Sequence, residues 1–272
     1  MAKKKEIKPI PIGAAIAMVL IGVALLAVFL VYMFGESGSG DIQDDVSLEQ
    51  SFGDGSSIEP PPVNVEVKET MADAKVGDAV IFGKYEQNGK TDSTEPIEWI
   101  VLEKQSDKLL LISRYALDTM AYDSNGKYTE WNQSTLYNKL NGEFLNGAFS
   151  EDEVSKLLPF GDDESEKVSI LSVEEAGKYY EYDSWRISAA TEYAVSNGAR
   201  IEDDACWWWL RDKGNIADSA SYVHFNGTIQ QKGFAVDYSS VAVRPIIWVS
   251  ADAETETEEI SSVLSETVSE AQ

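Results

Sequence analysis

The residue types that most often act as nucleophiles and bases are scarce in this sequence, which contains one cysteine, Cys206, and one histidine, His224. A catalytic cysteine or serine needs an adjacent base, and a histidine-based metal cage needs several histidines. We therefore interpret Cys206 as a small buried side chain beside tryptophans, with an intermolecular disulfide or a nucleophile as the alternatives. His224 alternates with Tyr222 on an expected strand, which favours a half-exposed structural histidine over a catalytic base.

Three consecutive tryptophans, Trp207, Trp208 and Trp209, are candidates for binding a ligand. Side chains alternate across a strand, so Trp207 and Trp209 share one face and Trp208 points to the other. A half-exposed pair of tryptophans could stack on sugar rings or anchor a protein partner. The favoured interpretation is nevertheless that the tryptophans are buried between a sheet and helices.

Two arginines, Arg211 and Arg244, end or interrupt apolar strands, where an unpaired guanidinium would be costly. We expect them to pair with carboxylates such as Glu98, with a ligand clamp as the alternative. The candidate ligand-binding residues are therefore Trp207, Trp209, Arg211, Tyr222, His224 and Arg244.

Two acidic clusters, at residues 123–126 and 162–166, could attract Ca²⁺, which prefers carboxylate oxygens. Neither fits the full alternating pattern of a calcium loop, so we expect a turn and a solvated loop instead. The sequence also contains no glycine-rich phosphate loop, nucleophile elbow or zinc-protease motif. We predict no metal, no cofactor and no identifiable catalytic residue. Paired carboxylates for glycoside cleavage remain open, because tertiary structure would bring such a pair together.

The composition of the chain limits its partners. Its 272 residues include 47 acidic and 22 basic ones, for a formal net charge of -25. Most of such a chain would repel the phosphates of a nucleic acid, so we expect no nucleic-acid binding. A hydrophobic fraction of 43% and 7 tryptophans nevertheless require a packed core.

The N-terminal part of the sequence predicts a membrane anchor. Residues 12–34 carry no charge and, at a rise of about 1.5 Å per residue, are long enough to cross a hydrocarbon layer of about 30 Å. The lysines within residues 1–11 place that end in the cytoplasm. A cleaved signal peptide is the alternative, although its apolar region would be shorter. We expect a single-pass protein of the cell membrane, held by the lipid bilayer through this helix, with everything after residue 35 outside the cell.

The rest of the chain divides by composition into three regions. Residues 35–75 are acidic and poor in large apolar residues, which predicts a disordered tether, and residues 251–272 predict a similar tail. Residues 76–250 predict one mixed α+β domain, with strands at both ends and short helices between them. Expected strands lie at 76–82, 97–102, 109–113, 168–171, 206–211, 221–225, 228–230 and 241–249; expected helix caps are Ser134, Ser150 with Glu153, Ser172 with Glu175, and Thr191.

An ordered set of motifs in residues 76–250 resembles a known bacterial family. The motifs are Val76-Gly77-Asp78, Glu95-Pro96-Ile97-Glu98-Trp99, Leu110-Leu111-Ile112-Ser113, Phe144-Leu145-Asn146, Trp207-Trp208-Trp209-Leu210-Arg211 and Val243-Arg244-Pro245. They are similar to domain of unknown function 6273, which occurs in secreted and membrane-anchored proteins and has no assigned activity. Residues 206–249 also resemble the closing sheet of C-type-lectin-like domains and of formylglycine-generating enzymes.

This sequence departs from both of those other groups. Formylglycine-generating enzymes need paired cysteines, and Cys206 stands alone. Calcium-dependent lectins carry Glu-Pro-Asn or Gln-Pro-Asp, whereas Glu95-Pro96 is followed here by Ile97. The resemblance therefore implies a lectin-like closing sheet without either chemistry.

Taken together, these features predict a membrane-anchored, extracellular recognition module that binds a glycan or a protein at a bacterial cell surface. The acidity of residues 76–250 favours a neutral or cationic partner over an anionic wall polymer. The alternatives are a cell-envelope hydrolase that uses paired carboxylates and a structural assembly subunit.

Overall fold

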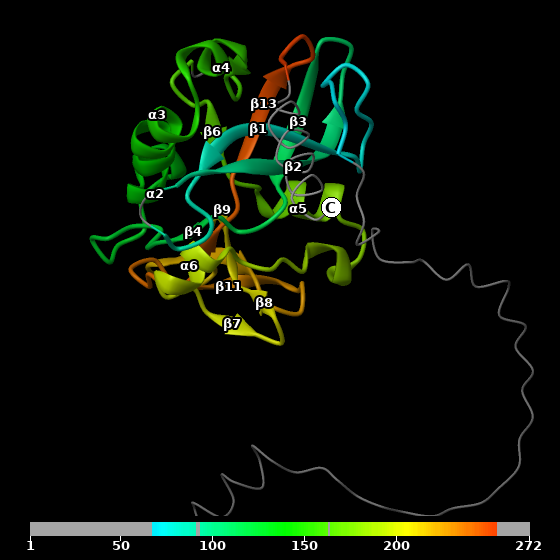
Figure 1. Ribbon diagram of the computed structural model, residues 1–272. Helices are drawn as coiled ribbons and strands as arrows, with labels where there is room; N and C mark the ends of the chain where they lie inside the picture. The colour runs from blue at the N-terminus through cyan, green and yellow to red at the C-terminus, as the bar shows by residue number, and fades with distance from the viewer. Residues whose placement is uncertain (1–66, 91–92, 163, 255–272) are drawn as a thin grey trace, which may run out of the picture. The chain divides into compact units, whose positions relative to one another are not determined.

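The computed structural model describes residues 67–90, 93–162 and 164–254 (Figure 1). The predicted cytoplasmic N-terminus, the predicted transmembrane helix at 12–34 and most of the predicted tether and tail lie outside these residues. Within the three described ranges, no helix is both long and apolar enough to cross a bilayer.

The described residues form short helices and many strands. The strands are β1 (Ala79–Tyr85), β2 (Glu95–Lys104), β3 (Lys108–Ser113), β4 (Asp118–Thr119), β5 (Leu157–Leu158), β6 (Val168–Ser169), β7 (Ile201–Glu202), β8 (Ala205–Cys206), β9 (Trp208–Lys213), β10 (Ser219–Val223), β11 (Ile229–Ala235), β12 (Ala242–Val243) and β13 (Ile246–Ser250). The helices are η1 (Trp131–Gln133), α2 (Thr135–Lys139), η2 (Leu140–Phe144), α3 (Leu145–Ala148), α4 (Glu151–Lys156), α5 (Val173–Tyr179), η3 (Asp183–Arg186) and α6 (Glu192–Ser196). This mixture confirms the α+β prediction.

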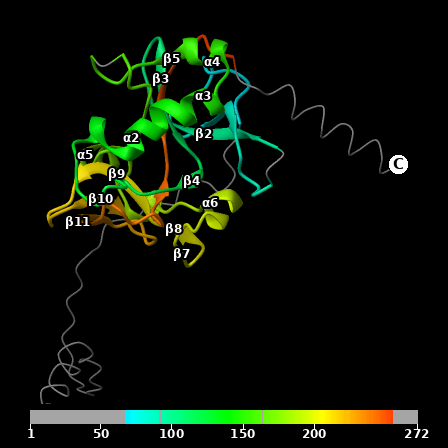
Figure 2. The ribbon, with the colours of Figure 1, turned by 90° about the vertical axis from the view of Figure 1, so that its left-hand side faces the viewer.

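The larger sheet joins the two ends of the folded part. Its strand order is β1-β2-β3-β13-β5, with β6 also paired to β13. The β2–β3 hairpin confirms the turn predicted between residues 102 and 109, and β13 adds antiparallel to β3. Helices α2, α3 and α4 lie along one flank of this sheet in Figure 1 and come to the front in Figure 2.

The second sheet has the order β11-β10-β9-β12-β4, and β7 and β8 form a separate small ladder. β9 and β10 are antiparallel, whereas β9 and β12 are parallel. The strand expected at 206–211 is therefore divided at Trp207 into β8 and β9. The hairpin expected around Asn226-Gly227 is present as β10 and β11, and β11 is longer than predicted.

The strand predicted over residues 241–249 is wrong as a single strand. It is interrupted at Arg244-Pro245, so that β12 belongs to the second sheet and β13 to the larger one. Proline has no N–H to donate to a strand ladder, which explains the break at this point. Arg244 consequently lies at the crossing between the two sheets.

Hydrophobic side chains pack against both faces of β9. Trp209 packs with Trp207 in one hydrophobic cluster, and Trp208 packs in another. The predicted alternation is therefore confirmed. Trp207 is 6% exposed and Trp209 is fully buried, which confirms the favoured interpretation of burial and contradicts a half-exposed pair. The tryptophans are buried because side chains cover the sheet on both faces.

The predicted helix starts are confirmed by their hydrogen bonds. The side chains of Ser134 and Thr191 accept from the backbone N–H three residues later. Ser150 with Glu153, and Ser172 with Glu175, form complete capping boxes.

The folded part extends beyond the boundaries that composition suggested. Met71 and Ala74, assigned above to the tether, are fully buried, and Ala253 is 4% exposed. Thr70 forms an isolated bridge to Glu254. Apolar residues at each end thus complete the core. Composition did not reveal them, because the residues around them are mostly polar or acidic.

Candidate functional site

Arg244 is buried at the crossing between the sheets, with 5% of its surface exposed. Its Nε donates to the carbonyl of Ser113 at 2.8 Å, and its Nη2 donates to the carbonyl of Arg114 at 3.3 Å. The guanidinium carbon lies 5.4 Å from the centroid of the Trp208 ring and 5.8 Å from that of the Tyr180 ring. These contacts fix the plane of the guanidinium.

The expected pairing of Arg244 with Glu98 is wrong. Glu98 forms its ion pair with Nη1 of Arg114, at 2.6 Å. No carboxylate of the described residues forms an ion pair with Arg244, and its Nη1 is a buried donor without a hydrogen-bond partner there. Carbonyl groups satisfy part of the guanidinium but do not neutralise its charge.

A cavity of about 450 Å³ opens beside Arg244, and we call it the Arg244 pocket. Its walls come from β2, from the residues after β3, from the end of α5, and from η3 with the segment that follows it. Tyr180 also lines this pocket, and its Oη is a second buried polar atom without a partner among the described residues. Two of the three such atoms in the described part of the chain thus belong to residues of one cavity. Buried polar groups are nearly always hydrogen-bonded, so this coincidence marks the pocket as a candidate binding site.

The rest of the lining is largely aromatic and apolar, with Arg114 and Ser188 as further polar residues. Tyr179, Tyr180 and Trp185 contribute aromatic rings. Val76 and Ile187 lie at its edge and are 64% and 46% exposed. The side chains that line it include two arginines but, within the described residues, no acid, histidine or cysteine.

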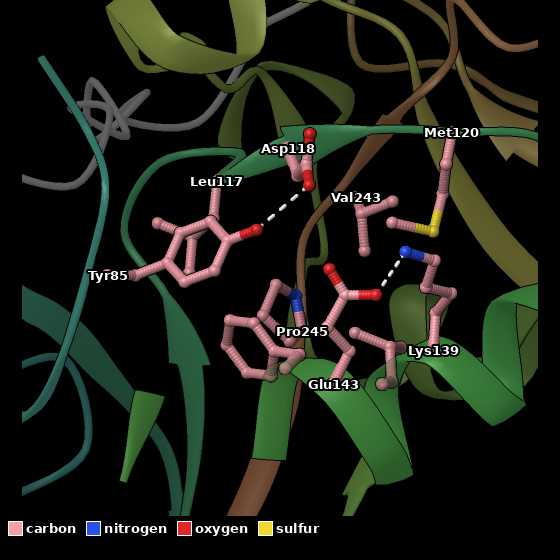
Figure 3. Close-up of a pocket in the computed structure, with 10 residues that line it drawn as sticks. Tyr85, Leu117, Asp118, Met120, Lys139, Glu143, Val243 and Pro245 are labelled. Carbon is pink, nitrogen blue, oxygen red and sulfur yellow. Dashed lines mark hydrogen bonds and ion pairs between the residues drawn. The ribbon is translucent and has the colours of Figure 1, made fainter. Parts of the chain in front are cut away.

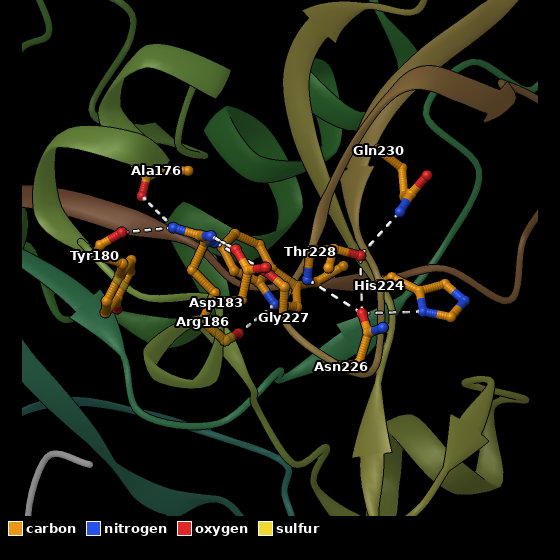
Figure 4. A network of polar contacts seen from close by, with 10 residues as sticks. Ala176, Tyr180, Asp183, Arg186, His224, Asn226, Gly227, Thr228 and Gln230 are labelled. Atoms are coloured by element: carbon orange, nitrogen blue, oxygen red, sulfur yellow. Dashed lines mark hydrogen bonds and ion pairs between the residues drawn. The ribbon is translucent and has the colours of Figure 1, made fainter. Parts of the chain in front are cut away.

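Buried Arg186 holds one wall of the pocket in place (Figure 4). Its Nε donates to the carbonyl of Gly227 at 2.8 Å, and its Nη1 donates to the carbonyl of Tyr180. Its Nη2 is paired with Asp183. A single side chain therefore ties the end of α5 and η3 to the turn between β10 and β11.

Gly227 permits this close approach. Its φ of +82° lies in the left-handed region, and a Cβ at this position would overlap the carbonyl oxygen of Asp183. Only glycine avoids both problems here.

Three of the six candidate residues, Trp207, Tyr222 and His224, lie together in one aromatic cluster. The Trp207 ring stacks on Tyr222 with centroids 5.0 Å apart, and His224 lies 4.6 Å from the Trp207 ring. The guanidinium of Arg200 covers the Trp207 ring at 4.2 Å. His224 Nδ1 lies 3.3 Å from Oδ1 of Asn226, in the turn seen in Figure 4. Their role in ligand binding stays a prediction.

The other two candidates have structural partners. Trp209 is fully buried, and its Nε1 donates to the carbonyl of Met120 at 2.9 Å. Arg211 forms an ion pair with Glu175 at 2.6 Å, which confirms the expectation of a carboxylate partner for this arginine. Burial opposes ionisation of Glu175, but the hydrogen bond and charge of Arg211 outweigh it and lower the pKa of this carboxyl.

A second, smaller cavity of about 60 Å³ contains two acids (Figure 3). Asp118 accepts from the hydroxyl of Tyr85 at 2.9 Å, and Glu143 is paired with Lys139. Burial, followed by the charge of Asp118, raises the pKa of Tyr85 above its ordinary value. Both carboxylates are thus engaged, in a space too small for a sugar ring.

Neither acidic cluster forms a metal cage in the part of the chain that the structure describes. Asp123 is 1% exposed and accepts from Thr129 and from the backbone of Asn125, so it organises a turn as expected. Glu166 accepts from the indole of Trp131 at 2.6 Å.

Cys206 is fully buried, in agreement with its interpretation as a small core residue. Burial raises the pKa of its thiol to about 12, against the opposing charge of Arg244. The thiolate, which is the reactive form, is therefore scarce at neutral pH.

Sequence reasoning found Arg244 but missed the pocket around it. None of the three residues Tyr180, Trp185 and Ile187 was singled out: Tyr180 falls in the helix expected after Ser172, and Trp185 and Ile187 lie outside every expected strand and helix. The density of aromatic residues over 179–185 was the available signal.

Comparisons with curated proteins and with solved structures find no match for this chain. A family model, described as domain of unknown function (DUF6273), matches residues 106–251. The matched region includes Arg244, Tyr180 and most of the pocket walls, but not β1 or β2. The chain therefore belongs to the family of the domain of unknown function DUF6273.

Proposed function

We propose that this chain is a membrane-anchored recognition module at a bacterial cell surface, whose folded domain binds a ligand in the Arg244 pocket without altering it. The observation that carries the proposal is the pair of unpartnered buried polar atoms, Arg244 Nη1 and Tyr180 Oη, on residues of one open cavity. A buried donor without a partner costs about 1–3 kcal/mol. A ligand that accepts from it, once the side chains that cover it shift, would remove that cost.

The size and lining of the pocket support binding of a small ligand. Its volume of about 450 Å³ falls in the usual range for ligand sites, about 300–1,000 Å³. Aromatic walls with a few converging polar groups are typical of such sites. The exposed apolar residues at the edge would continue the contact surface outward.

The same lining favours binding over catalysis. General acid–base catalysis needs a titratable group within hydrogen-bond reach of the reacting atoms, and nucleophilic catalysis needs an activated side chain. The described residues that line the pocket supply Ser188, arginines and tyrosines, but no acid, histidine or cysteine to act as a base or to activate the serine.

The membrane anchor at 12–34 and the extracellular placement of the domain are parts of this proposal that rest on the sequence. So does the likeness of residues 206–249 to a lectin-like closing sheet. A tether between helix and domain would let the pocket search the space near the membrane.

The alternative of a cell-envelope hydrolase has one observation in its favour, the presence of Asp118 and Glu143 in the smaller cavity. A glycosidase needs one acid to protonate the leaving group and another to act as base or nucleophile. Because Tyr85 and Lys139 already engage these two carboxylates, the recognition module has the stronger support.

Ligand-detected NMR on the full-length chain in lipid nanodiscs would test the proposal. The compounds are a defined mixture of monosaccharides, amino acids and small organic acids. We expect at least one compound to bind the wild-type protein and to be recovered unchanged by mass spectrometry. Binding should be lost in Ile187→Trp, which fills the mouth of the pocket, and kept in Ile216→Trp, at a similarly exposed residue outside it. Absence of any pocket-dependent ligand, or recovery of a cleaved compound, would contradict the proposal.

A further inference from the structure

We infer that the ligand of the Arg244 pocket is a small organic acid, whose carboxylate binds Arg244 and whose apolar or aromatic body fills the rest of the cavity. The inference rests on the proposed function, because it names the chemical class of the ligand bound at that same site.

The charge balance of the pocket supports an anionic ligand. Arg114 and Arg244 both line it, and the charge of Arg114 is matched by Glu98. The charge of Arg244 is matched by no carboxylate in the described part of the chain, although the chain holds 47 acids and only 22 basic residues. Chance pairing would therefore favour an acidic neighbour, and a buried charge without one is costly. A ligand carboxylate would complete the pair.

The guanidinium of Arg244 suits a carboxylate in particular. Carbonyl groups of the protein accept from its Nε and Nη2, whereas Nη1 has no acceptor among the described residues. Nη1 and the hydroxyl of Tyr180, which can also donate, are both covered by neighbouring atoms, so binding requires side chains of the pocket wall to shift and uncover them. A carboxylate offers two acceptor oxygens for these two donors, and hydrogen bonds between charged groups are the stronger kind. A sugar hydroxyl could accept from either donor but would leave the guanidinium charge unmatched.

The remaining lining selects the body of the ligand. Tyr179, Tyr180 and Trp185 present rings, and Ile100 and Leu102 add aliphatic surface. Aromatic rings stack on flat apolar groups, so an aromatic or branched acid fits better than a small polar one.

Three probes that share one skeleton test the inference: 3-phenylpropionate, 3-phenylpropanamide and 3-phenylpropylamine. Each is titrated into the full-length chain in nanodiscs by calorimetry at pH 7. We expect the carboxylate to bind about tenfold or more tighter than the amide, since its charge strengthens the hydrogen bonds. The amine should bind weakest, because Arg244 and Arg114 repel it.

Variants locate the binding to the pocket. Arg244→Gln should abolish the preference for the carboxylate. Because this buried substitution could prevent folding, Ile187→Glu and Ile187→Gln at the exposed edge provide a matched pair. The added negative charge in Ile187→Glu should weaken binding of 3-phenylpropionate several-fold relative to Ile187→Gln, and Tyr180→Phe should weaken it without removing the aromatic wall.

Equal binding of the three probes, tighter binding of the amide or the amine, or equal affinity of the two Ile187 variants would overturn the inference. These failures are distinguishable from failure of the proposed function. If none of the three probes binds but a neutral compound from the mixture binds in an Ile187-dependent way, the carboxylate inference fails and the recognition module stands. If nothing binds in the pocket, both fail.

Discussion

Replacing Gly227 with alanine should destabilise the domain more than the same replacement at Gly161 or Gly147. Gly227 has a φ of +82°, and a left-handed backbone costs an L-residue about 1–2 kcal/mol. The new methyl group would also overlap the carbonyl of Asp183, so η3 must move away from the turn. That movement would break the bond from Arg186 Nε to the Gly227 carbonyl and leave a buried guanidinium donor unpaired, at a further cost of about 1–3 kcal/mol. We expect the free energy of unfolding to fall by about 2–5 kcal/mol.

Two control variants separate these two costs. Gly161 has a φ of +63° and nothing within 4 Å of its added Cβ, so Gly161→Ala should show the backbone cost alone. Gly147 lies in helix α3 with open space around it, so Gly147→Ala should be neutral or stabilise by up to about 1 kcal/mol. Urea unfolding of the full-length chain, followed by tryptophan fluorescence, measures all three. An unfolding free energy for Gly227→Ala no lower than that of Gly161→Ala would refute the role assigned to the Asp183–Arg186–Gly227 contact.

Three further predictions concern acid stability, thiol reactivity and topology. Because Arg211 lowers the pKa of Glu175 in the folded state, this pair should stabilise the protein above the unfolded pKa of about 4.3 and lose its effect as the pH falls through the folded value. Glu175→Gln should therefore lower the free energy of unfolding at pH 7 by about 1–3 kcal/mol. It should also reduce the loss of stability between neutral and acid pH, whereas Glu174→Gln, at an exposed residue, serves as the control. An unchanged pH dependence of stability in Glu175→Gln would contradict this prediction. Cys206 should react with an aromatic disulfide reagent at pH 8 only after unfolding, since burial raises its pKa to about 12, and rapid labelling of the native protein would show that the thiol is accessible. Protease treatment of intact cells should remove the domain and spare only the N-terminal end, whereas loss of the first ~35 residues alone would reverse the predicted orientation.

Features that depend on neighbouring residues were predictable from the sequence. The capping boxes at Ser150 and Ser172 follow from a serine and a glutamate three positions apart, and the β2–β3 hairpin follows from two apolar runs around a short polar turn. In each case the interacting residues are close together in the sequence, so the feature does not depend on contacts between distant parts of the chain.

The break at Arg244-Pro245 was not predicted, although its cause is visible in the sequence. Residues 241–249 read as one apolar strand, and proline alone does not say on which sheet each half will pair. The parallel pairing of Ala242 with Trp208 and the antiparallel pairing of Ile246 with Ile112 join segments far apart in the chain. That division places Arg244 between the sheets, beside walls that come from other parts of the chain. A pocket assembled from such distant segments cannot be predicted from local sequence pattern.

The burial of Trp207 and Trp209 has a related cause. Alternation along a strand is a local property and was predicted, but whether a face is exposed depends on what packs against it. Tyr222, Phe234 and the guanidinium of Arg200 cover Trp207, and the carbonyl of Met120 receives the indole of Trp209. Aromatic residues in a run thus indicate a large core at least as readily as a binding platform.

The acidity of the chain is compatible with a carboxylate ligand, although net charge taken alone favours a neutral or cationic one. Charges on an exposed surface are screened over about 8 Å at physiological ionic strength. A group inside a cavity responds mainly to the charges that line it, where screening is weakest. Those charges belong to Arg244 and Arg114, and only Arg114 has a carboxylate partner among the described residues. Added salt should therefore weaken the repulsion from the acidic surface more than the contact with Arg244, and an acid bound in the pocket should keep or gain affinity as ionic strength rises.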